Sequence, residues 1–375
     1  MSRHVVAHSA WLGVLLCLIG CLAFSASEGA LLGFKRAVPG YTVSFPADHA
    51  AHPAYQTEWW YYTGHLRATS GKTYGYQLTF FRHRLDSSGP TLSPSKWFAD
   101  NLYMAHMAIT DEQGRRFVYG EKRNRAALGL AGAAEERYHV WNEDWLAERL
   151  GSVHHLKGDI PGFKLNLILT PLKPPVLHGA NQDGLSQKGE GQGHASYYYS
   201  YTRMQTEGVL HTSDGALDVE GISWMDHEFG STQLQESQVG WDWYSVQLAN
   251  NHELMLYHIR HKDGSFDPYS SGTLVRPDGT SLHLRREDFQ IQAHDTWRSS
   301  KSGAVYPQRW TLHVPKADLT LHLEPVLTDQ ELITDNSTRV TYWEGSVWVR
   351  GSMQGQATEG VGYVEMTGYV QRLNL

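Results

Sequence analysis

One short run in this chain, Trp224-Met225-Asp226-His227-Glu228, combines acidic, basic and aromatic side chains. Successive side chains of a strand point to opposite faces, so Trp224, Asp226 and Glu228 would share one face and His227 would lie on the other. An acid in an apolar cavity keeps its proton, and a carboxylate or a histidine can orient water. The run therefore predicts Asp226 as a catalytic acid, with Glu228 or His227 as the base. The alternative is a structural junction in which Asp226 and His227 pair to hold two domains together.

A second feature is an aromatic box that occurs twice, first around Trp59 and again around Trp241. Aromatic faces attract a cation at short range, so these side chains could form the wall of a ligand site. They could equally fill a barrel core without any ligand. The predicted ligand-binding residues are Trp59, Trp60, Tyr61, Trp224, Trp241, Trp243 and Tyr244.

The two copies of the box differ at one informative position, because Asp242 stands where the first copy has Trp60. A carboxyl group in an aromatic setting is a further candidate for acid catalysis. Glu58, which begins the first box, is explained more simply by a hydrogen bond that closes a barrel. We therefore add Asp242 to the predicted catalytic residues and leave Glu58 out.

Repetition extends beyond the boxes and predicts that a whole domain was duplicated. The run from Gly221 to Asp226 resembles the run from Gly360 to Glu365, and Glu207-Gly208 resembles Glu344-Gly345. On this basis we expect the first domain to close near Gly230 and the second to start near Ser237.

Most of the chain reads as short alternating strands separated by turn residues, as in residues 74–82 and 163–169. The best helical candidate is residues 133–150. Many strands with few helices favour antiparallel sandwiches or barrels. Residues 171–193 form a long loop rich in Pro, Gly and Gln, which is unusual in a compact domain and typical of a functional or mobile segment.

Composition excludes several classes of protein. The 375 residues are 12% aromatic and 19% charged, with a net charge of −7 and no run of Lys or Arg, so nucleic acid is not expected as a partner. The two cysteines are Cys17 and Cys21, which leaves no disulfide and no thiol nucleophile in the rest of the chain.

Motifs for metals, cofactors and nucleophilic hydrolysis are missing from the sequence. His252, Glu253 and His258 lack the spacing of a zinc-binding helix. No Gly-x-Ser-x-Gly turn, phosphate loop or dinucleotide fingerprint occurs. We therefore predict no metal and no cofactor.

The N-terminus has the pattern of an export signal. Residues 11–19 are apolar but too short to span a bilayer, and small residues follow them. Leu18-Ile19-Gly20-Cys21 is similar to a bacterial lipobox, which predicts lipidation of Cys21. The alternative is an ordinary signal peptide cut near Ala23-Phe24-Ser25.

Four motifs together resemble the AttH/CrtC family. They are the box that begins at Glu58, the run from Trp224 to Gly230, the box at Trp241, and Tyr342-Trp343-Glu344-Gly345. The family contains secreted AttH-like proteins, often labelled predicted secreted hydrolases, and carotenoid 1,2-hydratases, also called hydroxyneurosporene synthases. The resemblance implies two lipocalin-like (calycin) antiparallel β-barrels in tandem.

The resemblance and the motifs lead to one organisation and two functional hypotheses. We expect a signal segment at residues 1–25 and lipocalin-like domains at 38–232 and 233–375. The first hypothesis is a hydratase that adds water to a carbon–carbon double bond of a lipid or isoprenoid-like substrate. The second is a non-catalytic carrier or periplasmic lipoprotein that serves an ABC export system. Both place the protein in the periplasm or, through its lipid anchor, at the outer membrane.

Overall fold

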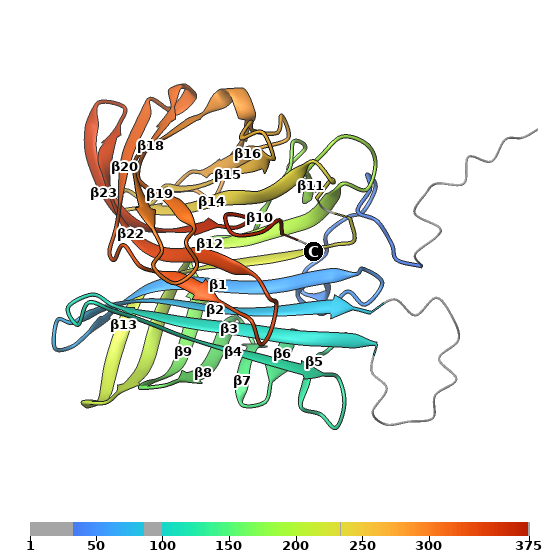
Figure 1. The fold of residues 1–375 in the computed structure, drawn as a ribbon, viewed down its shortest axis with the longest axis vertical. Helices are drawn as coiled ribbons and strands as arrows, with labels where there is room; N and C mark the ends of the chain where they lie inside the picture. The colour runs from blue at the N-terminus through green and yellow to red at the C-terminus, as the bar shows by residue number, and fades with distance from the viewer. Residues whose placement is uncertain (1–32, 86–99, 233, 374–375) are drawn as a thin grey trace, which may run out of the picture.

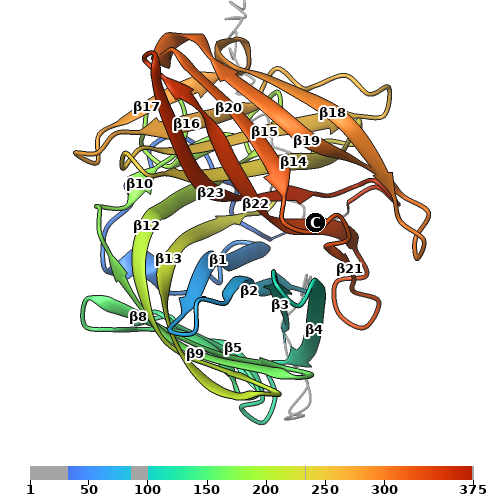
Figure 2. The same cartoon turned by 90° about the vertical axis from the view of Figure 1, so that its left-hand side faces the viewer.

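The computed structural model describes residues 33–85, 100–232 and 234–373. Over these ranges the chain forms antiparallel strands, three short 3-10 helices and no α-helix. The strands belong to two sheets that curl into two stacked barrels, the second less closed than the first (Figures 1 and 2). The predicted all-β, two-barrel fold is confirmed. No helix in the described ranges is long and apolar enough to cross a membrane.

The first sheet has thirteen strands and pairs in the order β4-β3-β2-β1-β13-β12-β9-β8-β7-β6-β5, with β10 and β11 added at β12. A 3-10 helix, η2 (Ala47–His49), precedes it. The strands are β1 (Thr57–Ala68), β2 (Thr73–Arg84), β3 (Asn101–Asp111), β4 (Arg116–Arg125), β5 (Ala131–Ala133), β6 (His139–Asn142), β7 (Trp145–Leu150), β8 (Val153–Ile160), β9 (Phe163–Pro171), β10 (Val176–Leu177), β11 (Leu185–Gln187), β12 (Ala195–Thr212) and β13 (Gly215–Gly230).

The second sheet has ten strands in the order β17-β16-β15-β14-β23-β22-β20-β19-β18, with β21 added at β22. The strands and 3-10 helices are β14 (Gln238–Leu248), β15 (Glu253–His261), β16 (Ser271–Val275), β17 (Ser281–Arg285), η3 (Arg286–Asp288), β18 (Gln290–Arg298), β19 (Val305–Val314), η4 (Pro315–Ala317), β20 (Leu319–Pro325), β21 (Glu331–Ile333), β22 (Thr341–Met353) and β23 (Gln356–Met366).

The predicted helix at residues 133–150 is wrong, because this segment forms β5, β6 and β7. Val140 and Ala147 are fully buried in the first barrel, at alternating positions of their strands. Glu143 adopts a left-handed φ of 57° in the turn between β6 and β7, which a continuous helix does not allow.

Strand register shows which residues of the two barrels are equivalent. Tyr61 of β1 lies opposite Asp226 of β13, and Trp243 of β14 lies opposite Glu365 of β23. The sequence match between the runs that end at Asp226 and Glu365 is therefore also a structural match. The two barrels pack through these equivalent strands.

Each barrel also sends an arm across to the other. The arm of the first barrel is residues 172–194, where His178 bonds to Thr273 and Ser186 bonds to Tyr257. The arm of the second barrel is residues 326–340, where Ser337 bonds to His106. The two arms occupy equivalent places, because the first joins β9 to β12 and the second joins β20 to β22. The segment that the sequence singled out as functional or mobile is therefore one of two arms that each bond to the opposite barrel.

A buried ion cluster fixes the barrels further. Glu253 of the second barrel is fully buried and lies 2.6 Å from both Lys173 Nζ and Arg203 Nε of the first. Because two cations surround one carboxylate, its charge is compensated away from water. The barrels are held in one arrangement, and the space between them can therefore have a fixed shape.

Candidate functional site

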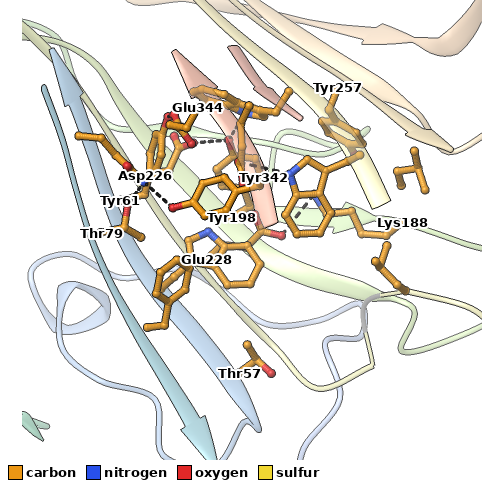
Figure 3. A pocket seen from close by; sticks show the side chains of 18 residues that line it. Thr57, Tyr61, Thr79, Lys188, Tyr198, Asp226, Glu228, Tyr257, Tyr342 and Glu344 are labelled. Carbon is orange, nitrogen blue, oxygen red and sulfur yellow. Dashed lines mark hydrogen bonds and ion pairs between the residues drawn. The ribbon is translucent and has the colours of Figure 1, made fainter. Parts of the chain in front are cut away.

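A cavity lies between the two barrels and contains about 850 Å³ of empty space, including the part open to solvent (Figure 3). The cavity is lined by Thr57, Trp59, Tyr61, Gln77, Thr79, Phe81, Lys188, Tyr198, Asp226, Glu228, Leu234, Trp241, Trp243, Tyr257, Ile259, Tyr342, Glu344 and Glu365.

The duplicated aromatic boxes meet each other at this cavity. The rings of Trp59 and Trp241, which are equivalent, stack with centroids 6.4 Å apart. Tyr61 packs edge-on against its equivalent Trp243, with centroids 5.3 Å apart. Four of the seven predicted ligand-binding residues therefore line one wall, because duplication placed the same face of each barrel toward the other.

Strand alternation divides the acidic run as the sequence predicted. Asp226 and Glu228 face the cavity, whereas His227 lies on the opposite face of β13 inside the first barrel. Trp224 does not line the cavity, but its indole N–H donates to Asp226 and its ring packs against Trp243. The structure therefore brings Asp226 and Glu228 together and separates His227 from them.

Asp226 is fully buried among three donors. The Tyr198 hydroxyl donates to Oδ2 at 2.7 Å, the Trp224 indole donates to Oδ1 at 2.6 Å, and the Ser200 hydroxyl donates to Oδ1. Burial raises the pKa of Asp226 to about 7, although these three donors favour the carboxylate. The group can therefore exchange a proton near neutral pH.

A chain of donors continues from Asp226 into the first arm. Thr273 bonds to His178 Nδ1 at 2.8 Å, and His178 Nε2 lies 2.7 Å from the Ser200 oxygen. Burial lowers the pKa of His178 to about 3, so the ring is neutral and carries one proton. Since Ser200 gives its own proton to Asp226, His178 must donate through Nε2 and accept through Nδ1. His178 thus orients Ser200 toward Asp226.

Glu344 is a buried acid that sequence reasoning did not select. Its Oε1 accepts a hydrogen bond from the Tyr61 hydroxyl at 2.6 Å, and its Oε2 is buried with no hydrogen-bond partner among the described residues. Glu365 lies directly opposite Glu344 on the neighbouring strand. Burial and the nearby Glu365 raise the pKa of Glu344 well above its ordinary value. Glu344 therefore enters the cavity as a protonated acid.

Sequence reasoning did not select Glu344 because it aligned the two copies of this strand incorrectly. The sequence paired Glu344 with Glu207, but register places Glu344 opposite Glu365 and places Ser200 opposite Asp226, so Ser200 is the true counterpart of Glu344. The offset between the two strands at this point is 344 − 200 = 144, whereas the Glu-Gly similarity gave 344 − 207 = 137, so the sequence match was seven residues out of register. The motif that contains Glu344 was visible in the sequence, but its partner was not.

Lys188 is a second cavity residue that the sequence did not select. Its Nζ lies 3.3 Å from Glu228 Oε1 and 4.2 Å from the ring centroid of Tyr257. Burial lowers the pKa of Lys188, but Glu228 outweighs this effect and the net shift is upward, so the side chain is an ammonium ion. Lys188 is the one Lys or Arg among the described residues that line the cavity.

His227 belongs to a different buried cluster, centred on Glu58. His227 Nε2 and His52 Nδ1 each lie 2.8 Å from Glu58 Oε1, and Arg82 Nε lies 3.0 Å from Oε2. His52, Glu58 and His227 offer ligand atoms within 4.8 Å of one another, which is the spacing of a metal site. Each of these atoms already has a hydrogen-bond partner, and Arg82 supplies positive charge. We therefore interpret the cluster as an ion-paired anchor of the first barrel.

Three further predicted site residues lie away from the cavity. Trp60 stacks on His227 in the first barrel, and Tyr244 lies in the core of the second. Asp242 is buried in the second barrel, 3.0 Å from both Arg260 Nε and the Tyr369 hydroxyl. These side chains are on the strand faces that point into the barrels. Cys21 lies outside the described residues.

We expect Glu365→Gln to stabilise the protein at about pH 8 and to have less effect at about pH 5. Burial raises the pKa of Glu365 to about 7, against an unfolded value of about 4.3. As pH rises between these values the unfolded chain ionises first, so stability is lost in the wild type. Glutamine does not ionise, so the variant does not lose stability in this way as pH rises. Thermal unfolding at both pH values measures the effect, and an equal shift at both would contradict it.

The fold and cavity define a double-barrel protein with an acidic, aromatic site between its barrels. The chain belongs to the AttH-like family, whose sequence profile matches residues 36–369. The crystal structure of an AttH from Nitrosomonas europaea is 33% identical, with a TM-score of 0.81, and the match covers 90% of this chain and all of that one. The crystal structure of kievitone hydratase from Nectria haematococca is 14% identical and has the same fold, with a TM-score of 0.69 over 90% of this chain and 97% of that one.

Two curated relatives carry names of hydro-lyases. Dehydratase asqC of Emericella nidulans is 20% identical over 60% of this chain and 63% of its own length. Kievitone hydratase of Fusarium solani subsp. phaseoli is 20% identical over 46% of this chain and 49% of its own length. This chain therefore matches less than two thirds of either relative. Distant members of the same fold thus include enzymes named for the addition or removal of water.

Proposed function

We propose that this protein is a hydro-lyase that adds water to, or removes it from, an apolar molecule held between the barrels. The observation that carries the proposal is Glu344, a fully buried carboxyl with one oxygen unpartnered within the described chain and an aromatic cavity in front of it. The names of the distant relatives support this class of reaction. The low identity to them leaves the substrate to experiment.

The cavity offers separate groups for the two halves of the reaction. Glu344, kept protonated by burial and by Glu365, gives a proton to one carbon of a double bond. Asp226, held by Tyr198 and Ser200, accepts a proton from the water that attacks the other carbon. Removal of water uses the same groups with their roles exchanged.

A substrate need not be known to test this proposal. The purified protein is incubated with an envelope lipid extract in water labelled with oxygen-18, and untargeted mass spectrometry records compounds that gain or lose one molecule of water. We expect at least one apolar compound to gain a labelled oxygen with the wild type and not with Glu344→Gln. If both proteins leave the extract unchanged, the hydro-lyase proposal fails.

A non-catalytic carrier remains the second candidate, because the stacked Trp59 and Trp241 and the neighbouring Phe81 and Ile259 give the cavity a largely apolar wall. A carrier binds ligand without changing it. Native mass spectrometry of the same incubation separates the two. An apolar ligand bound unaltered, with no labelled product, supports the carrier.

We also propose that Cys21 anchors the protein to a membrane, as the lipobox pattern of residues 18–21 predicts. Cys21→Ser is expected to abolish incorporation of radiolabelled palmitate and to release the protein from membrane pellets, since several acyl chains are needed for firm attachment. Fractionation of cells that express either form measures this. If the wild type incorporates no palmitate, the lipid anchor is excluded.

A further inference from the structure

Lys188 supplies hydrogen-bond donors to the cavity, and the proposed acid–base pair of Glu344 and Asp226 does not use them. An ammonium group has three N–H donors. Among the described residues its polar partner is Glu228, at 3.3 Å, and its other near neighbours are the ring faces of Tyr257 and Tyr198, at 4.2 and 5.1 Å. Donor capacity therefore remains toward the cavity.

The position of Lys188 is fixed by its backbone. Its N–H donates to the His194 carbonyl at 2.8 Å, and its own carbonyl accepts from Gln238 Nε2 at 2.8 Å. Because Gln238 begins the second barrel, this bond ties the first arm to that barrel. The backbone of Lys188 is therefore ordered before a ligand arrives, which lowers the cost of binding.

The partner Glu228 is itself restrained. The Ser196 hydroxyl donates to the same oxygen, Oε1, that faces Lys188. The charges of the ammonium and the carboxylate largely cancel, so no charged ligand is needed to neutralise the pair. A neutral oxygen acceptor can take a free N–H of Lys188 without displacing Glu228. Figure 3 shows Lys188 and Glu344 on different sides of the cavity.

We propose that the substrate is an apolar molecule with a carbonyl oxygen, which Lys188 binds while the apolar remainder lies along the tryptophan wall. This inference rests on the proposed function, because it names the substrate class of the same cavity. A carbonyl fits the site because it accepts a charge-assisted hydrogen bond and has no proton to leave unpaired. A hydrocarbon would leave the Lys188 donors without a partner, which costs affinity.

The probes for a test are β-ionone, a conjugated ketone, and β-ionol, its alcohol. Quenching of tryptophan fluorescence measures their binding to the purified protein. A hydrogen bond from an ammonium group to the ketone also shifts the absorption band of the conjugated system to longer wavelength. We expect the wild type to prefer the ketone and to shift its band. Lys188→Met should bind the ketone about tenfold to hundredfold more weakly, without the shift, and bind the alcohol as before.

Two further variants secure the interpretation. Lys188→Arg keeps donors at this position and should retain the band shift, whereas Lys301→Met removes an exposed lysine paired with Asp329 and should change nothing. If the wild type binds ketone and alcohol equally with no shift, the carbonyl inference is overturned and the proposed cavity function stands. If neither probe binds and no labelled product forms from the lipid extract, both fail.

Discussion

Glu344→Gln is expected to slow the addition of water by about 10²–10⁴-fold while ligand affinity stays within a few-fold of the wild type. Glutamine has the shape of glutamate and keeps an oxygen for the Tyr61 hydroxyl, which lies 2.6 Å from Glu344 Oε1. It cannot deliver a proton to carbon. The rate of oxygen-18 incorporation measures the chemical step, and tryptophan fluorescence measures binding.

A matched control is available in the same barrel. Glu331 is also fully buried, but its carboxylate accepts hydrogen bonds from Ser299, Ser302 and Tyr306 and does not line the cavity. Glu331→Gln should lower stability and leave the rate of the folded protein unchanged. If Glu344→Gln keeps the wild-type rate and Asp226→Asn does not, the acid is Asp226, as the sequence alone suggested.

The sequence predicted the fold well because its signals are local or repeated. Alternation along β13 separated Asp226 from His227 correctly, since side-chain direction in a strand depends only on position. The match between Gly221–Asp226 and Gly360–Glu365 anticipated the strand equivalence because both runs lie on paired, unbulged strands.

The sequence could not predict contacts that depend on register across strands or on the path of a loop. A short Glu-Gly similarity that was seven residues out of register hid the equivalence of Ser200 and Glu344. Lys188 reaches the cavity only because residues 172–194 cross to the other barrel, and no periodic pattern encodes that crossing. Asp242 was selected for its mismatch with Trp60, yet both side chains point into their own barrels.

The second large effect is expected in stability rather than catalysis, at Glu58. Glu58→Gln should lower the free energy of unfolding by about 3–5 kcal/mol at neutral pH, because it leaves the buried guanidinium of Arg82 without its carboxylate. It also weakens the bonds from His52 and His227. Denaturant unfolding measures the change. Asp214→Asn, which removes an exposed partner of Lys72, should leave the stability almost unchanged.

The effect of Glu58→Gln should shrink in acid. Burial alone would raise the pKa of Glu58, but the charges of His52 and Arg82 outweigh it and hold the pKa below its ordinary value. A carboxyl group with a lowered folded pKa stabilises the fold above its unfolded pKa, about 4.3, and loses that contribution as pH falls below it. The wild type should therefore begin to lose its advantage over Glu58→Gln below about pH 4, and the difference should keep shrinking down to pH 2. A difference that stays constant over this range would show that Glu58 acts through packing and not through its charge, and that the cluster is not the ionic anchor of the first barrel.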